Sequence, residues 1–516
     1  MTCVNHTPPL VRIASVRHVP HIMPLRKSPA APQGHAAHTK DAAAARGLPG
    51  SMLRPIKITM LGAGSMFTPR LVSDVLRIPG GIGGEIALVD IDLKRLATMQ
   101  KLIEKVITTT GVSGWKVTAN PDRRKVLKGS HYIVNCIEVS GLECVRHDND
   151  IPARHGIDQC IGDTIGPGGL FKALRTIPVW LDVLRDAEEL CPEAIVLNYT
   201  NPMAMLCTAA GRSSSMQVVG LCHSVQGTSD LLARRAGVPI SEVEWECAGI
   251  NHLAWFTTFK HNGRDLYPSL RRKARADLEL ALREGPPRRP KRKSPSAWEI
   301  PEHHRDLVRK HMMLHFGAFI TESSGHLSEY LPFYRKRRDL LKTWARPGYD
   351  GGSSFYADNW PTWRKNADKS RMDMVRGRSP VGWDRSWEYA SWIIEAREKD
   401  QAFRIHGNVM NNVAGAGPLI TNLPTDACVE VACLIDRRGI HPTRYGALPR
   451  QMAALCTSNL SMFDLGAQAA IERSKELAVH ALSLDPLTAA VCGLDEIRKM
   501  THELFDAEKR FLPGYR

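Results

Sequence analysis

Two positions in the chain hold side chains that could bind a transition metal. Cys222 ends the apolar run QVVGLC, His223 follows it, and His252 lies 30 residues after Cys222. A thiolate and an imidazole together suit a borderline divalent metal. The spacing is not that of a recognised metal motif, so other interpretations stay open on spacing alone. Cys222 would then be a buried core thiol, and His252 a structural hydrogen-bonding residue.

A glycine turn near the start of the folded region predicts a dinucleotide site. The sequence GAGSMF follows the run IKITML and precedes a helical pattern, so a pyrophosphate could approach the backbone at a helix N-terminus. Asp90 ends the next apolar run, 26 residues after Gly64, where a ribose-binding acid belongs. An acid there favours NAD over NADP, although Asp92 competes for the assignment. We assign four residues of the turn to the cofactor: Gly62, Gly64, Ser65 and Phe67.

This turn is weak evidence by itself, because Phe67 stands where the usual fingerprint has its third glycine. The elements around it strengthen the prediction. Apolar β-branched runs predict strands at 56–61, 85–90, 132–137, 194–199 and 217–222. Helical periodicity predicts helices at 69–76, 93–109 and 171–190, and a further helix beginning at Pro202. Alternating strands and helices indicate an α/β fold with a doubly wound parallel sheet, which binds ligands at the carboxyl ends of its strands.

The length of 516 residues exceeds what one hydrophobic core usually serves, and the pattern changes along the chain. Residues 1–53 are rich in Ala, Pro, His and Arg and are predicted to be a disordered extension. Residues 54–250 are predicted to be an NAD-binding Rossmann domain. Residues 251–516 are predicted to be a C-terminal substrate and catalytic domain with an exposed basic loop at 283–297. Helices are expected there at 302–314, 388–398, 462–482 and 494–504.

The composition excludes several classes of protein. The net charge is +16, but much of the excess lies in the first 53 residues and in the basic loop, and no zinc-finger spacing or RNA-binding aromatic motif accompanies it. We therefore expect no nucleic-acid partner. No apolar run of about 18 residues predicts a membrane span. The 12 cysteines form no CxxC pair, which favours reduced thiols and a cytoplasmic location.

Seven sequence blocks, in order, resemble glycoside hydrolase family 4 over roughly residues 55–510. The blocks are GAGSMF, GDTIGPGGLFKALRTIP, NYTNPMAM, GLCHSVQG, AGINHLAWF, TESSGHLSEYLPFY and HGNVMNN. The resemblance implies a Rossmann domain like that of lactate and malate dehydrogenases, joined to a second α/β (α+β) catalytic domain. It also implies two cofactors, NAD and a divalent metal, usually Mn2+. A homodimer or homotetramer is expected, and the sequence does not distinguish them.

The resemblance also assigns roles to single residues. Cys222 and His252 match the metal ligands, and Tyr330 matches the tyrosine proposed as the base. Three further residues match positions near the sugar and the nicotinamide: Asn201, Asp163 and Arg175. For Tyr330, the alternative on sequence alone is an aromatic side chain packed in the core.

The mechanism implied by the resemblance is redox elimination. NAD removes hydride from C3 of the sugar, and the resulting ketone acidifies the C2 proton, which Tyr330 removes. The metal stabilises the developing enolate as a Lewis acid. The glycosidic oxygen leaves, water adds, and the hydride returns, so that NAD is regenerated. A free tyrosine has a pKa of about 10, so a nearby cation must assist Tyr330.

The residue after the metal cysteine tracks the substrate class within the family. His223 occupies that position and resembles the α-galactosidase members, whereas members acting on 6-phosphorylated α-glucosides carry aspartate there. Histidine can act as a general acid near neutral pH. Other candidates for this role are Glu322, His326 and Glu329.

Three alternatives to an α-galactosidase stay open. An α-galacturonidase or α-glucuronidase of the same family also carries histidine after the cysteine and would need an arginine for the uronate. A plain NAD-dependent dehydrogenase shares the Rossmann start but lacks the Cys–His and Asn–His pairs. A cofactor-binding regulatory protein without activity is disfavoured because Cys222 and His252 are both present.

Overall fold

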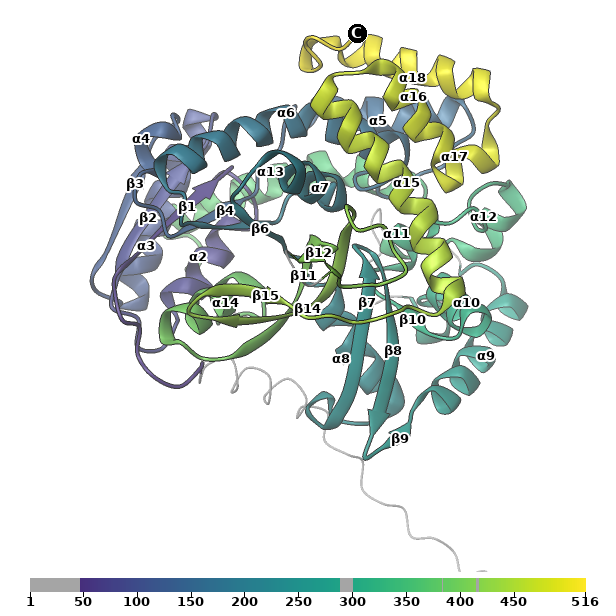
Figure 1. Ribbon diagram of the computed structural model, residues 1–516, viewed down its shortest axis with the longest axis horizontal. Coiled ribbons are helices and arrows are strands. Elements are labelled where there is room, and N and C mark those ends of the chain that lie inside the picture. The colour runs from purple at the N-terminus through teal and green to yellow at the C-terminus, as the bar shows by residue number, and fades with distance from the viewer. Residues whose placement is uncertain (1–46, 288–299, 383, 414–416) are drawn as a thin grey trace, which may run out of the picture.

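One mixed β-sheet runs through the protein (Figure 1). The computed structural model describes residues 47–287, 300–382, 384–413 and 417–516. In these residues the sheet has 13 strands, and one half of it has the strand order β3-β2-β1-β4-β5-β6. The strands of this half are β1 (Ile56–Leu61), β2 (Gly84–Val89), β3 (Trp115–Ala119), β4 (Tyr132–Asn135), β5 (Ile195–Asn198) and β6 (Gln217–Gly220).

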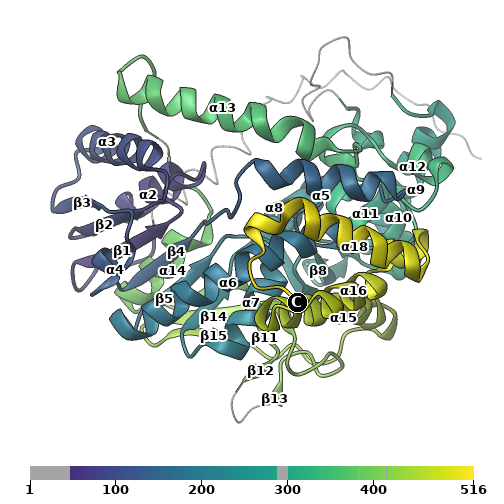
Figure 2. The same cartoon turned by 90° about the horizontal axis from the view of Figure 1, so that it is seen from above.

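All strand pairs in this half are parallel, which confirms the predicted doubly wound sheet. In β1 and β4 nearly every residue is buried, as expected for strands covered by helices on both faces. Helices α2 and α3 pack together on one side, and α4, α6 and α7 lie on the other (Figure 2). Their bounds are α2 (Thr68–Leu76), α3 (Leu93–Thr110), α4 (Arg124–Leu127), α6 (Gly166–Leu190) and α7 (Met203–Ser213).

The sheet continues past β6 with antiparallel strands. The first is β11 (Phe403–Met410), whose Asn408 pairs with Gly220 at the end of β6. The order then runs β14-β7-β8-β10 away from this junction. These strands are β14 (Cys428–Asp436), β7 (Val243–Ile250), β8 (Leu253–His261) and β10 (Phe319–Ile320), with β9 (Arg264–Asp265) and β15 (Gly439–Pro442) at their edges; β12 (Asn412–Val413) and β13 (Gly417–Pro418) form a separate pair.

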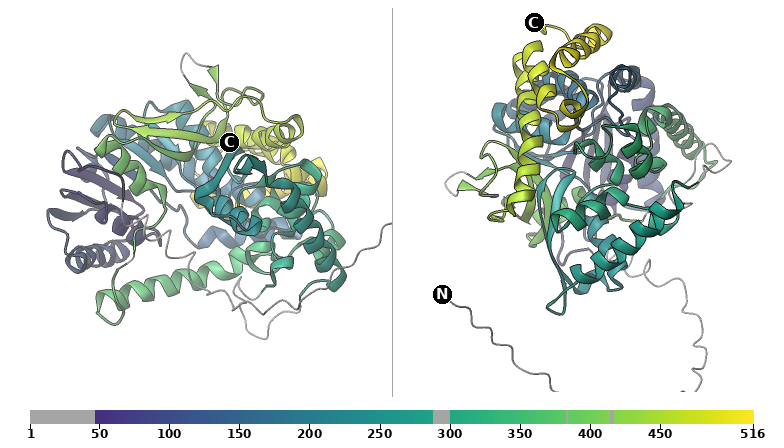
Figure 3. Two further views of the ribbon diagram at one scale, coloured as in Figure 1. Left: turned by 90° about the horizontal axis from the view of Figure 1, so that it is seen from below. Right: turned by 90° about the vertical axis from the view of Figure 1, so that its right-hand side faces the viewer.

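The remaining helices surround the antiparallel half and the C-terminal end (Figures 1 and 3). No helix among the described residues has the length and apolar character needed to cross a membrane. Figure 2 shows α13 extending from α3 toward α12. Their bounds are α5 (Glu143–Arg154), α8 (Ser224–Ala236), α9 (Tyr267–Glu284), α10 (Leu307–Phe316), α11 (Ser324–Glu329), α12 (Arg338–Trp344), α13 (Phe355–Val375), α14 (Tyr389–Lys399), α15 (Arg450–Glu472), α16 (Lys475–Leu484), α17 (Pro486–Val491) and α18 (Leu494–Glu508).

The predicted boundary between residues 250 and 251 is not a break between domains. It falls in the short turn between β7 and β8, which pair along their whole length. Both strands belong to the antiparallel half, because β7 also pairs with β14. Cutting the chain at 250 would separate two hydrogen-bonded partners, so the change from the parallel to the antiparallel half comes before β7. The sequence missed this because a strand pattern carries no information about its pairing partner.

The predicted extension 1–53 is also too long, because residues 47–53 are fixed on the folded body. The Leu48 N–H donates to Glu395 Oε1 at 2.8 Å, and Met52 is 4% exposed. Residues 1–46 and most of the basic loop 283–297 lie outside the described residues, and Arg283 and Glu284 belong to α9.

One predicted helix is two helices in the structure. The helix expected at 462–482 is interrupted at Arg473, whose φ of 54° is left-handed, and Ser474 then caps α16. The apolar periodicity continues across this break, so the periodicity alone did not reveal it.

We predict that Glu395→Ala strongly destabilises the protein. Glu395 is fully buried, and its carboxylate accepts a 2.6 Å hydrogen bond from Lys399 and pairs with Arg385 at 2.6 Å. Removal of one partner of a buried ion pair leaves an uncompensated charge and costs about 3–5 kcal/mol. The free energy of unfolding in urea measures this loss. Glu193→Ala, at an exposed acid, is the control and should change stability by less than about 0.5 kcal/mol.

Candidate active site

The glycine turn after β1 has no room for side chains. Gly62 has a φ of 70°, and a β-carbon there would lie 2.4 Å from the carbonyl oxygen of Cys136. A β-carbon on Gly64 would lie 2.8 Å from Oδ2 of Asp90. The Gly64 N–H donates to that same oxygen at 2.6 Å. Both glycines are therefore needed for the close approach between the turn, the end of β4 and the acid at the end of β2.

The structure separates the roles of the two neighbouring acids. Asp92 caps α3, since its Oδ1 accepts from the N–H groups of Lys94 and Arg95, both at 3.1 Å. Asp90 instead faces the glycine turn through Oδ2, and its Oδ1 accepts from the Asp92 N–H at 2.9 Å. Of the two acids, Asp90 is therefore the one that faces the glycine turn, and Asp92 is a helix cap.

The other two predicted cofactor residues lie at the start of α2. The Phe67 N–H donates to Oγ of Ser65 at 3.2 Å, which closes the turn before the helix. The side chain of Phe67 is 42% exposed, and its ring stacks toward Tyr199, which follows β5, with 6.3 Å between the ring centroids. The turn therefore presents an exposed aromatic ring at the carboxyl end of the sheet, where a dinucleotide binds in this kind of fold.

Folding brings Cys222 and His252 together with Glu322. Cys222 follows β6, His252 lies in the turn between β7 and β8, and Glu322 follows β10. One potential ligand atom from each lies within 4.8 Å of the other two. His252 Nε2 is 3.6 Å from Glu322 Oε2, and Cys222 Sγ is 4.0 Å from the same oxygen. A thiolate, an imidazole and a carboxylate form a donor set that fits a divalent first-row metal.

Backbone strain at two of these residues supports the fit. His252 and Glu322 have φ angles of 63° and 67°, in the left-handed region that side chains of this size rarely adopt. Such conformations cost of order 1–3 kcal/mol and cluster at functional sites. His252 Nδ1 is also buried without a hydrogen-bond partner in the described chain. Burial lowers the pKa of His252 to about 4, which keeps the imidazole in the neutral form that binds metals.

His326 lies between Glu322, in the group formed with Cys222 and His252 (the metal-ligand cluster), and the predicted substrate residue Asp163. Its Nδ1 is 3.3 Å from Glu322 Oε1, and its Nε2 is 3.9 Å from Asp163 Oδ1. Burial opposes the charged imidazole, but the two carboxylates outweigh burial and raise the pKa of His326 to about 10. The site therefore holds a cation between two anions at neutral pH.

Asp163 and Asn201 lie together, as the sequence blocks led us to expect. Asn201 Nδ2 donates to Asp163 Oδ2 at 3.3 Å, and Lys172 Nζ is 3.6 Å from that oxygen. Burial favours the neutral acid, but the charges of Lys172 and His326 hold the pKa of Asp163 well below its usual range. A small pocket opens here, lined in part by Asp163, Lys172, Glu138, Asn149 and Tyr356. Its walls offer the acids, amides and cation that recognise sugar hydroxyls.

Tyr330 ends α11 beside this cluster. It is 1% exposed, and its ring centroid is 6.2 Å from that of His252. Burial raises the pKa of Tyr330 well above its ordinary value, and the hydroxyl of Thr164 opposes this shift. The phenol is therefore close to the metal-ligand cluster but protonated unless a cation is added there.

His223 differs from the other predicted residues in being exposed. Its side chain is 63% exposed at the start of α8, and Nδ1 lies 3.6 Å from Glu388 Oε1. Its charge affects the pKa values of both Glu322 and His252, so it borders the cluster. An accessible histidine at this position can exchange protons with a ligand or with water.

Arg175 is not brought into this group. It lies on α6 with 1% of its side chain exposed, and Nη2 donates to Asp148 Oδ2 at 2.8 Å. A second nitrogen, Nη1, pairs with Glu508. Both partners are buried carboxylates, so the guanidinium links α6 to α5 and α18 instead of facing the pocket around Asp163.

Sequence reasoning did not assign Glu322 to the metal. It considered Glu322 and His326 only as proton donors, although their spacing of four residues already allowed them to face each other. Glu430 was not among the candidate site residues that the sequence analysis named. It is buried on β14, where burial raises its pKa to about 8, and its position in an ordinary strand pattern gave no signal.

Comparisons with known proteins agree with the geometry. A model described as family 4 glycosyl hydrolase matches residues 57–238, and one described as family 4 glycosyl hydrolase C-terminal domain matches residues 247–488. An α-galactosidase of Bacillus subtilis is 38% identical over 89% of this chain and 100% of its own length. An α-galactosidase of Rhizobium meliloti is 37% identical over 89% of each chain.

The fold is shared with solved structures as well. The crystal structure of a 6-phospho-α-glucosidase from gut microorganisms, in complex with NAD and Mn2+, has a TM-score of 0.71 at 21% identity. The matched region covers 90% of this chain and 100% of the glucosidase chain. The two family models together span most of the described chain, and the relatives match over nearly their full length. The resemblance seen in the sequence blocks is confirmed, and this chain is a glycosidase that belongs to glycosyl hydrolase family 4.

Proposed function

We propose that the chain is an NAD- and divalent-metal-dependent α-galactosidase. The observation that carries the proposal is the convergence of Cys222, His252 and Glu322 at the carboxyl end of β6, beside Asn201 and Asp163. The galactoside preference is supported by the two α-galactosidases that match this chain over most of its length. His223, directly after the metal cysteine, supports the same preference.

The proposed NAD site is the turn at Gly62 and Gly64 with Asp90. The proposed metal site is Cys222, His252 and Glu322, and a protein of this fold was crystallised with NAD and Mn2+. When bound, NAD supplies a reversible hydride acceptor, and the metal supplies a Lewis acid for neighbouring sugar oxygens. The separation of the two sites along the sheet edge suits a substrate that lies between them.

The remaining residues bind the sugar and move protons. Asn201 and Asp163 are proposed to hold ring hydroxyls, because Asp163 lines the pocket, Asn201 donates to its carboxylate at 3.3 Å, and the amide and carboxylate differ in hydrogen-bonding character. Tyr330 is proposed as the base that removes the C2 proton. Its burial holds the proton on the free enzyme, and a divalent cation on the neighbouring His252 would favour the phenolate.

His223 is proposed as the general acid for the departing glycosidic oxygen. Its exposed imidazole can exchange protons with water in each cycle, and its Nδ1 lies 3.6 Å from Glu388 Oε1. His326 is a poorer candidate, because Glu322 and Asp163 stabilise its charge and raise its pKa to about 10. A donor with so high a pKa releases its proton less readily.

A uronide is the alternative substrate. Recognition of a uronate requires an arginine that can pair with the C6 carboxylate. Arg175, the arginine predicted near the sugar, already pairs with Asp148 and Glu508. Arg175 is therefore not available for a uronate, and the uronide alternative would need another arginine. The cytoplasmic location and the homodimer or homotetramer expected from the sequence stay predictions.

With Mn2+ and a thiol reductant present, we predict release of p-nitrophenol from its α-galactoside only when NAD is added. The physical reason is that neither the glycine turn nor the Cys222 cluster contains a group able to take up hydride by itself. Undiminished release without NAD, after removal of bound nucleotide, would contradict the proposed mechanism. Release from α-galacturonides alone would instead identify the uronide alternative.

We predict that Gly64→Val weakens NAD binding by about 5- to 150-fold, the range expected for an overpacked contact of about 1–3 kcal/mol. The new side chain would meet the carboxylate of Asp90, since a β-carbon alone would lie 2.8 Å from it. Titration calorimetry with NAD measures the change. Gly493→Val, at a glycine with an ordinary φ of −76°, is the control. Equal NAD affinity in both variants would disprove the assignment of the nucleotide site to this turn.

We predict that Cys222→Ser and Glu322→Gln each weaken Mn2+ binding by at least about 10-fold, a loss that changes to the surroundings of a metal ligand commonly cause. Each variant removes a negatively charged donor with little change in volume. Mn2+ titration and the Mn2+ dependence of activity are the measurements. Cys191→Ser, at a buried cysteine outside the cluster, should behave as the unmodified protein. Full activity of Cys222→Ser at low Mn2+ would disprove the assignment.

A further inference from the structure

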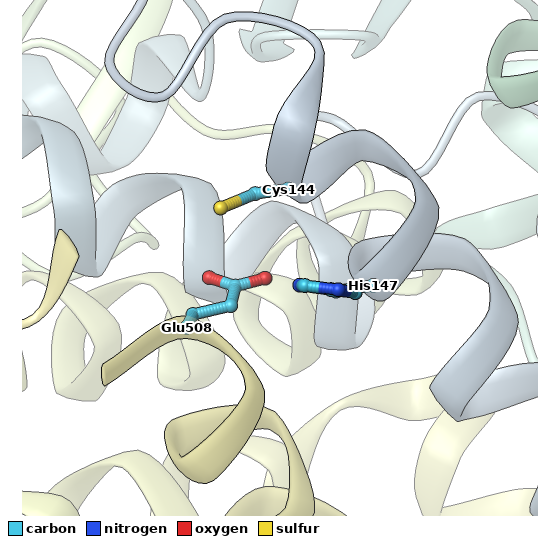
Figure 4. Close-up of side chains that lie close together, drawn as sticks. All are labelled: Cys144, His147 and Glu508. Atoms are coloured by element: carbon cyan, nitrogen blue, oxygen red, sulfur yellow. The ribbon is translucent and has the colours of Figure 1, made fainter. Parts of the chain in front are cut away.

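A second group of metal-binding side chains lies outside the active site, between α5 and α18. Cys144 and His147 are three residues apart on α5 and therefore share one face of the helix. Glu508 ends α18 and reaches the same place. One potential ligand atom from each residue lies within 4.8 Å of the other two. Figure 4 shows the carboxylate of Glu508 between the sulfur of Cys144 and the imidazole of His147.

This group contains buried atoms that lack a partner in the described part of the chain. Glu508 is fully buried, and Oε1 has no hydrogen bond, although Oε2 pairs with Arg175. Nδ1 of His147 is also buried and unpaired. A buried polar atom without a partner costs about 1–3 kcal/mol. Glu508 is thus an unpaired acceptor directed into the space between a thiol and an imidazole, and a bound ion would satisfy it.

The surrounding charges favour a divalent cation. Arg175 pairs with Asp148, and burial together with the nearby Asp148 carboxylate raises the pKa of Glu508 to about 9, so Glu508 holds a proton at neutral pH. Metal binding requires the loss of the protons on Glu508 and on the Cys144 thiol, which then gives three negative charges against the one positive charge of Arg175. A divalent ion would then make the group neutral, as a buried cluster of charges requires.

We propose that Cys144, His147 and Glu508 bind a divalent metal ion of the zinc class as a structural site. Thiolate, imidazole and carboxylate are the usual zinc ligands, with bond lengths of about 2.0–2.3 Å, so binding would draw the three side chains slightly together. The ion would join α5, which follows the parallel strand β4, to the last long helix of the chain. The site is separate from the one at Cys222, because it uses other elements and does not depend on the proposed function.

The test measures metal content in a protein that has lost its active-site ligand. Cys222→Ser is dialysed against Zn2+ and analysed for bound metal, and Co2+ is then substituted so that thiolate ligation gives a charge-transfer absorption. We expect Cys222→Ser to retain one equivalent of metal and the thiolate absorption. Adding Cys144→Ser should abolish both. Cys492→Ser is the matched control, since this cysteine contacts the end of α5 through the His155 carbonyl but lies outside the group.

Folding is checked separately by circular dichroism and by thermal unfolding in a chelator. His147→Gln provides a second variant, because His147 is only half-buried and its loss leaves the Arg175 ion pairs intact. It should raise the Kd for Zn2+ by at least about 10-fold. A folded Cys222→Ser protein that binds no metal would overturn the proposal. The proposal would also be overturned if the cobalt absorption survives when Cys144→Ser is added to Cys222→Ser.

Discussion

The arrangement of the active site depends on one junction in the sheet, where β11 lies antiparallel beside β6. At this junction Asn408 pairs with Gly220, so the antiparallel strands continue directly from the parallel ones. Gly220 has no space for a side chain, since a β-carbon would lie 2.6 Å from the sulfur of Met203. The side chains of Met203 and Cys207 on α7 therefore pack closely against the last residue of β6.

This continuity explains how distant residues meet. Cys222 follows β6 at the carboxyl end of the parallel half, where ligands bind in such folds. The β7–β8 turn carries His252 back toward the same edge, and β10, which pairs with β8, ends just before Glu322. The left-handed backbone at both residues lies in short turns held between regular elements, β7 and β8 around His252 and β10 and α11 around Glu322.

Charge is the second constraint on this region. His326 lies between Glu322 and Asp163, and Lys172 offsets Asp163, so each buried anion has a cation nearby. A divalent ion at Cys222 would add to this balance and would lower the cost of ionising Tyr330. The group around Arg175, at the meeting point of α5, α6 and α18, pairs the guanidinium with Asp148, and burial raises the pKa of the second carboxyl group, Glu508, to about 9. Both regions show that burial of charge in this protein is tied to places where several elements converge.

The sequence by itself determined the parallel half of the fold and the identity of the nucleotide turn. Short apolar runs and a glycine turn are local patterns, and local sterics and periodicity are sufficient to read them. The position of Asp90 at the end of β2 followed from the same local pattern, although only the structure distinguished it from Asp92. Seven blocks in a fixed order were enough to indicate the family.

The tertiary structure alone decided which side chains share a site. It joined Glu322 to Cys222 and His252, directed Arg175 to Asp148 and Glu508, and placed the end of the parallel half before β7. Strand pairing and the meeting of helices are contacts between residues far apart in the chain. No local pattern encodes them, because a strand or helix of given periodicity can pack its apolar face against many partners.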